Sequence, residues 1–148
     1  MFRVIAHYAP STHPDRDPQA RYGGSISYDY ATVAYDANSG ATLWRARYNA
    51  AGNKESQDEP NSIAVSLDGS RVFVTGNTIA QFNRDYATVA YEATTGAKLW
   101  VKLYNGAGND DDAGLALAPS PDSSAVFVTG YSSGAEGNLD YTTLAYAQ

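Results

Sequence analysis

Short runs of β-prone residues alternate with turn residues along most of the chain. In the run 30–35, Tyr and Thr alternate with Ala and Val, and the runs 86–91 and 141–146 repeat this alternation. A period of two is typical of a pleated strand whose two faces differ. No window shows the 3.6-residue period of an amphipathic helix. The pattern therefore predicts an all-β chain.

A complete repeat adds three further strands to such a run. Gly40 and Gly96 lie in the turns before the last strand, where a positive φ is needed. Asp68-Gly69 and Pro121-Asp122-Ser123 are typical of tight hairpin turns. The predicted strands are an innermost one at 62–67 and 114–118, a second at 71–75 and 125–129, a third in the alternating runs, and a fourth at 43–48 and 99–104.

These strands belong to a repeat of about 55 residues. Residues 29–49 match 85–105 at 14 of 21 positions, and 66–76 match 120–130 at 8 of 11. A strand-rich period of this length is typical of propeller blades. We expect antiparallel four-stranded blades, about two and a half per chain. The predicted division is a leader with a possible strand at 1–28, a partial blade at 29–61, a full blade at 62–105 and a truncated blade at 114–148.

The spacing of one tryptophan motif carries a family resemblance. Ala, Gly and Trp recur at positions 1, 7 and 11 of two runs, as Ala34, Gly40 and Trp44 and as Ala90, Gly96 and Trp100. This spacing resembles the tryptophan-docking motif of the quinoprotein-type (PQQ-like) β-propellers, and the DYATVAY and VFVTG segments resemble actinobacterial repeats of that group. The resemblance implies that each Trp packs between neighbouring blades, against the Ala and a peptide plane near the Gly.

The chain departs from the enzymes of this family. Quinoprotein dehydrogenases hold PQQ over a Trp, with Ca²⁺ beneath and often a ring made by adjacent cysteines. This chain has no cysteine, and both of its Trp residues are assigned to docking. The sequence therefore argues against PQQ and predicts no cofactor, with Ca²⁺ left as an alternative.

An acidic run of three aspartates is the candidate Ca²⁺ site. Asp110, Asp111 and Asp112 follow Asn109 in a loop before an inner strand, and Gln57-Asp58-Glu59 is their counterpart one unit earlier. Crowded carboxylates suit a hard cation, but three consecutive residues cannot all face one ion, so a solvated acidic turn with Asp112 holding the loop is the other interpretation. If there is a binding face, we expect it to contain Asp58, Glu59, Asn109 and Tyr131, which begins a Ser-, Gly- and Asn-rich loop.

The net charge and the short apolar runs of the chain argue against several kinds of partner. Ten basic and 16 acidic residues give a net charge of −6, which repels nucleic acid and anionic lipid. No apolar run approaches the roughly 20 residues of a membrane span, and the apolar stretch near the start is too short for a signal peptide. The resemblance implies parent proteins that are secreted or at the cell surface. A small-molecule or glycan ligand cannot be identified from the sequence.

These observations favour a noncatalytic propeller-repeat module that acts as a structural or binding scaffold. The alternative is a propeller enzyme, similar to a quinoprotein dehydrogenase or a metal-dependent lyase, with its site on the acidic loops. An incomplete blade would expose strand edges, which pair readily with other chains, so we expect a homo-oligomer. Residues 1–8 would complete a neighbour's blade or, alternatively, start the first blade of their own chain.

Overall fold

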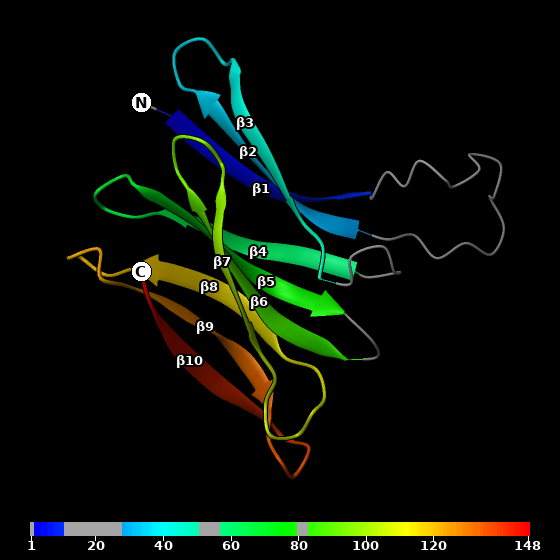
Figure 1. Ribbon diagram of the computed structural model, residues 1–148. Helices are drawn as coiled ribbons and strands as arrows, with labels where there is room; N and C mark the ends of the chain where they lie inside the picture. The colour runs from blue at the N-terminus through cyan, green and yellow to red at the C-terminus, as the bar shows by residue number, and fades with distance from the viewer. Residues whose placement is uncertain (1, 11–27, 51–56, 80–82) are drawn as a thin grey trace, which may run out of the picture.

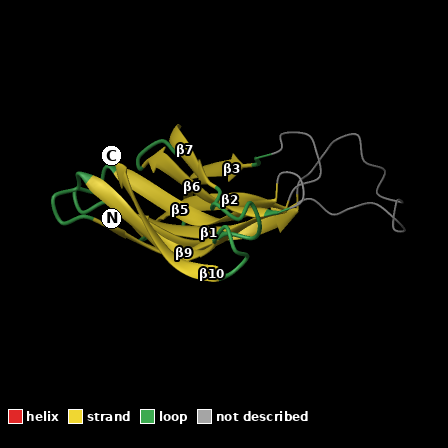
Figure 2. Ribbon diagram, turned by 90° about the horizontal axis from the view of Figure 1, so that it is seen from below, coloured by secondary structure: helices red, strands yellow, loops and turns green. Residues whose placement is uncertain are grey.

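The computed structural model describes residues 2–10, 28–50, 57–79 and 83–148, and these form strands and loops without a helix (Figures 1 and 2). No described segment is therefore a helix long and apolar enough to cross a membrane. The all-β prediction is confirmed. The strands are β1 (Phe2–Pro10), β2 (Tyr28–Asp36), β3 (Thr42–Tyr48), β4 (Gln57–Val65), β5 (Arg71–Ile79), β6 (Arg84–Glu92), β7 (Lys98–Tyr104), β8 (Ala113–Pro119), β9 (Ala125–Ser133) and β10 (Leu139–Ala147).

The ten strands form three antiparallel groups, which follow one another from top to bottom in Figure 1. Blade 1 contains β1, β2 and β3, blade 2 contains β4 to β7, and blade 3 contains β8, β9 and β10. A single parallel bridge between Tyr28 and Gln57 connects blades 1 and 2. This architecture is that of partial propeller blades.

β1 lies in the first blade of its own chain. It pairs with β2 over nine residue pairs, from Phe2 opposite Asp36 to Pro10 opposite Tyr28. This is the same place that β5 takes beside β6 in blade 2. Of the two alternatives for residues 1–8, the structure therefore has the one in which they start the first blade. Residues 11–27 of the predicted leader lie outside the described residues.

Two segments predicted as loops are in strands. Gln57-Asp58-Glu59 was interpreted as an acidic turn, but β4 begins at Gln57 and pairs with β5 through these residues. A register shift between Pro60 and Ser62 lets the ladder continue past the proline. Tyr131 was predicted to begin a loop, but it lies within β9, opposite Tyr141. Both strands are longer than their apolar patterns because backbone pairing continues through polar residues.

Blade 2 is buried on both faces. Every residue of β5 from Val72 to Thr78 is buried, and so is every residue of β6 from Tyr86 to Tyr91. In β10 of blade 3, exposed and half-buried residues alternate instead. A strand shows alternation when only one of its faces is covered. Blade 2 therefore lies between two neighbours, and one face of blade 3 is open.

Trp44 joins blade 1 to blade 2. Its indole N–H donates a hydrogen bond to the carbonyl oxygen of Ala93 at 2.8 Å, and the side chain is 7% exposed. A Cβ on Gly96 would lie 2.6 Å from the ring, so the indole packs directly on this glycine, whose φ is +73°. Gly96 is required twice over, because neither the φ nor the space admits a side chain.

Trp100 stands at the same place in blade 2 but has a different environment. Its ring lies 5.9 Å from the ring of Phe73 within blade 2 and 5.9 Å from that of Tyr146 in blade 3. The side chain is half-buried, and it packs beside the buried cluster of Phe73, Ala90 and Val126. Ala34 and Ala90 lie directly opposite Trp44 and Trp100 on the neighbouring strands.

We predict that the two tryptophans differ in their contribution to stability. Trp44→Ala removes a buried aromatic ring and leaves the Ala93 carbonyl without its donor, so it should lower the free energy of unfolding by about 3–5 kcal/mol. Trp44→Phe should cost less, since most of the packing remains. Trp100→Ala should cost clearly less than Trp44→Ala because its ring is half-exposed. Urea unfolding followed by circular dichroism measures all three, and equal losses for the two Ala variants would contradict this account.

Candidate functional site

Asp112 fastens the loop between β7 and β8. Its two carboxylate oxygens accept the backbone N–H groups of Gly106 at 2.8 Å and Ser133 at 2.9 Å, and its own N–H donates to the carbonyl oxygen of Arg84 at 2.6 Å. The side chain is fully buried. Hydrogen bonds from N–H groups to a carboxylate are stronger than those between neutral groups. Asp112 thus ties the end of β7 to the ends of two other strands.

Asp58 has the same role one unit earlier. It accepts the backbone N–H of Ala50 at 3.2 Å and the hydroxyl of Thr78, and it is fully buried. The sequence predicts Asp58 as part of a binding face, whereas the structure buries its side chain completely. The reason is that the backbone N–H following each outer strand needs an acceptor, and this repeated aspartate supplies it.

The other two residues of the acidic run have separate partners. Asp111 accepts the backbone N–H of Arg84 at 3.0 Å and lies 3.4 Å from its guanidinium, while Asp110 accepts the N–H of Asp111 at 2.9 Å. The part of the chain that the structure describes contains no group of three or more His, Asp or Glu side chains arranged for a metal ion. Calcium binding at Asp110, Asp111 and Asp112 stays the alternative to the expectation of no cofactor.

The remaining residues of the predicted binding face lie at one end of the blades. Asn109 is exposed, has a φ of +48° and accepts a hydrogen bond from the Asn105 side chain at 2.7 Å. Tyr131 is half-buried in β9 opposite Ala113, directly after the acidic run. Glu59 is half-buried in β4 of the preceding blade. The structure therefore places Asn109 in the loop between blades 2 and 3, Tyr131 in blade 3 and Glu59 in blade 2.

Asp85 is a half-buried carboxylate that sequence reasoning missed. At the equivalent position of blade 1, Asp29 forms an ion pair with Arg47 at 3.0 Å. Leu103 replaces that arginine in blade 2, and Oδ1 of Asp85 is buried without a hydrogen-bond partner among the described residues. Burial, and then the neighbouring charge of Asp112, raise the pKa of Asp85. Leu103 stands in β7 where β3 has Arg47, although the two strands are otherwise similar. This difference was the sequence signal that Asp85 lacks the ion pair of Asp29.

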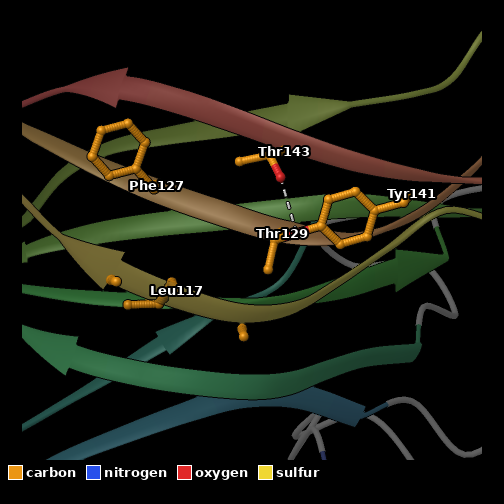
Figure 3. Close-up of a pocket in the computed structure, with 7 residues that line it drawn as sticks. Leu117, Phe127, Thr129, Tyr141 and Thr143 are labelled. Atoms are coloured by element: carbon orange, nitrogen blue, oxygen red, sulfur yellow. Dashed lines mark hydrogen bonds between the residues drawn. The ribbon is translucent and has the colours of Figure 1, made fainter.

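The open face of blade 3 exposes two large aromatic side chains, Phe127 and Tyr141. A shallow hollow of about 230 Å³ lies on this face, between the side chains of β8 and those of β9 and β10 (Figure 3). Tyr141 and Phe127 stand at its two ends, with the Thr129 and Thr143 hydroxyls 3.1 Å apart between them. The lining residues are Ala116, Leu117, Ala118, Phe127, Thr129, Tyr141 and Thr143.

This face has a covered counterpart in the same molecule. Phe127 and Tyr141 are 46% and 79% exposed, whereas Phe73 and Tyr86, at the equivalent positions of blade 2, are fully buried against blade 3. The same two residue types are thus buried at the seam between blades 2 and 3 and exposed on the open face of blade 3. The sequence repeat could not show this, because it gives the same residues to both blades. The open face is the candidate binding surface.

Comparison with known proteins matches the repeat region. A family model described as outer membrane protein assembly factor BamB matches residues 29–143. The match runs from β2 into β10 and so includes part of all three blades. No curated protein matches the chain.

We predict opposite effects for one substitution made in two repeats. Asp85→Asn should raise the free energy of unfolding at pH 7, since the raised pKa means that the charged carboxylate destabilises the folded state. The gain should disappear near about pH 3, where the wild-type carboxyl is also neutral. Asp29→Asn, the matched control, should lower stability by about 1 kcal/mol through loss of the Arg47 ion pair. Urea unfolding at both pH values tests this, and a loss of stability in Asp85→Asn at pH 7 would contradict it.

Proposed function

The chain belongs to the PQQ-repeat β-propeller family that this match describes, and on that premise we propose that it is a noncatalytic propeller-repeat module. Its function would be to act as a scaffold that binds a partner at the open face of blade 3. The observation that carries the proposal is the exposure of Phe127 and Tyr141 on a face whose counterpart in blade 2 is fully buried. Large exposed apolar patches on soluble proteins commonly mark interaction sites.

The hydrogen bonds of the acidic residues support a noncatalytic role. A carboxylate that acts as a general base or metal ligand needs an oxygen free for substrate or ion. Both oxygens of Asp112 accept backbone N–H groups, and Asp58 bonds Ala50 and Thr78. These bonds hold the loops between blades. The alternative, an enzyme with its site on the acidic loops, would rest on Asp110 and Asp111.

The tryptophan contacts extend this proposal. The bond of Trp44 to Ala93 and its packing on Gly96 fit the docking contact that the family resemblance implies. Trp100 would have the same function toward a blade that supplies an equivalent glycine. Its half-exposed ring and its contact with Tyr146 are compatible with that role. Docking tryptophans would make each blade depend on the next.

Assembly with other copies of the chain stays a prediction. The open face of blade 3 and the edge of β10, which pairs with no further strand among the described residues, support association in general. A homo-oligomer would be detected by light scattering as a multiple of the 15.8 kDa chain mass. A clean single-chain mass would contradict this prediction and leave the scaffold to act with a different partner.

We predict that the open face binds apolar probes. The dye ANS should increase its fluorescence with the folded wild type, and Tyr141→Ser should reduce that increase by about half or more, since it removes much of the exposed face. Leu43→Ser is the matched control, because Leu43 is 53% exposed but lies on blade 1. If Leu43→Ser and Tyr141→Ser reduce the fluorescence equally, the open face has no special affinity and the proposed function is wrong.

We also predict that neither Ca²⁺ nor PQQ raises the melting temperature beyond a control of equal ionic strength. A ligand that binds the folded state stabilises it by RT ln(1 + [L]/Kd), so thermal shift would detect either. The measurement includes Asp110→Ala and Asp111→Ala, which spare the structural Asp112. A rise with Ca²⁺ that these variants remove would favour the metal-site or enzyme alternative.

A further inference from the structure

Asn105 and Gly106 are the only Asn-Gly pair of the chain, and they begin the loop between β7 and β8. Asn105 is exposed, whereas Gly106 is buried. Asparagine is a chemically labile residue, and a following glycine has no Cβ to hinder the approach of its backbone nitrogen to the asparagine side chain. The sequence thus places one labile peptide unit in this loop.

The packing of the loop requires the glycine of this pair. A Cβ on Gly106 would lie 2.1 Å from the hydroxyl oxygen of Ser132 and 2.7 Å from the carbonyl oxygen of Ser133. The φ of Gly106 is not positive, so the requirement comes from the close approach of blade 3 alone. The equivalent residue one repeat earlier is Ala50. The Asn-Gly pair is therefore a consequence of how blade 3 packs on this loop.

Two hydrogen bonds hold the pair in the folded loop. The side-chain amide of Asn105 donates to Oδ1 of Asn109 at 2.7 Å. The backbone N–H of Gly106 donates to the buried carboxylate of Asp112 at 2.8 Å. The first bond holds the amide group that would leave in a reaction between the two residues, and the second holds the nitrogen that would attack.

That reaction is deamidation, and it needs no enzyme. The Gly106 nitrogen loses its proton to solvent base and forms a bond to the side-chain carbonyl carbon of Asn105. The bond from that carbon to the amide nitrogen breaks, and the amide group takes up a proton and leaves as ammonia. Water then opens the cyclic imide at either carbonyl carbon, which gives aspartate or isoaspartate. Water is the only co-reactant, and no group is oxidised or reduced.

Asp112 opposes the first step of this reaction. Loss of the N–H proton would leave a negatively charged nitrogen 2.8 Å from a carboxylate oxygen, and a neighbouring like charge disfavours the charged form. The charge-assisted hydrogen bond of Gly106 would be lost as well. The Gly106 nitrogen can therefore react only after this part of the loop has left Asp112.

We propose that Asn105 is a site of spontaneous deamidation, and that its rate is set by the opening of the loop between β7 and β8. This inference goes beyond the scaffold function, because it requires no partner. Asp112 also accepts the backbone N–H of Ser133 in blade 3, so opening of the loop loosens the seam between blades 2 and 3. Isoaspartate adds a carbon to the main chain and shifts Gly106 relative to Asp112. Each opening that leads to reaction thus leaves a permanent chemical mark at this seam.

The first experiment compares the folded chain with the unfolded chain. Both are incubated at the same pH, one in buffer and one in guanidinium chloride, and peptide mass spectrometry measures the aspartate and isoaspartate formed at Asn105. Conversion should be at least about tenfold faster in the unfolded chain, since the folded chain reacts only through local opening. Equal rates would overturn the control by the loop, and no conversion in the unfolded chain would overturn the site itself.

Two substitutions test the two hydrogen bonds. Asn109→Gly removes the acceptor of the Asn105 amide and suits the φ of +48° at this exposed position. Asp112→Asn removes the charged acceptor of the Gly106 N–H. Each should speed conversion in the folded chain by about threefold to tenfold, as expected for the loss of one hydrogen bond, and should leave the rate in guanidinium chloride unchanged.

Circular dichroism shows whether both variants remain folded. Should Asp112→Asn unfold, Asn109→Gly carries the test, because it changes only an exposed side chain. Unchanged or slower conversion in folded Asn109→Gly overturns the proposal. Slower conversion in folded Asp112→Asn also overturns it, since Asp112 would then assist the reaction instead of opposing it.

Ala50→Gly provides a matched control in the preceding repeat. The backbone N–H of Ala50 donates to Asp58 at 3.2 Å. The side-chain amide of Asn49 donates to Asp29 at 2.8 Å, so both bonds of the Asn-Gly pair have counterparts here. In guanidinium chloride, Ala50→Gly should make Asn49 react about as fast as Asn105. In the folded variant Asn49 should react clearly more slowly, and equal rates in the two conditions would contradict protection by these bonds.

Discussion

A β-sheet with apolar residues on both faces is stable only between two other layers, and this constraint governs the molecule. The strands β5 and β6 are buried along nearly their whole length on both faces because blade 1 covers one face and blade 3 the other. The seam contacts follow from this arrangement. Trp44, Tyr30 and Tyr86 each reach from one blade to backbone atoms of the next, so they set how closely the sheets approach.

The aspartates at the loop end of the blades serve the same arrangement. Asp58 and Asp112 each accept a backbone N–H just after an outer strand and bond to a neighbouring strand as well. A carboxylate can do this because it accepts several hydrogen bonds at once. The acidic character of these loops therefore has a structural cause. The broad face of blade 3, by contrast, exposes Phe127 and Tyr141.

The repeat made much of the fold predictable from the sequence. Period-two runs located β2, β6 and β10, and the predicted left-handed glycines are found at Gly40 and Gly96, with φ of +72° and +73°. The repeat could not predict what differs between equivalent positions. Trp44 and Trp100 share a motif but not an environment, since only Trp44 contacts a glycine of the next blade. Asp29 and Asp85 likewise differ through a partner on another strand, Arg47 in one blade and Leu103 in the other.

The two-sided burial of blade 2 also determines how the molecule comes apart. In a linear array of repeats, each unit is stabilised mainly by its nearest neighbours, so a unit with two neighbours is held by two interfaces and an outer unit by one. The outer blades can therefore open locally while blade 2 stays folded, whereas blade 2 cannot open without separating both seams. Because β5 and β6 are buried on both faces, we expect their amide hydrogens to exchange more slowly than those of β10.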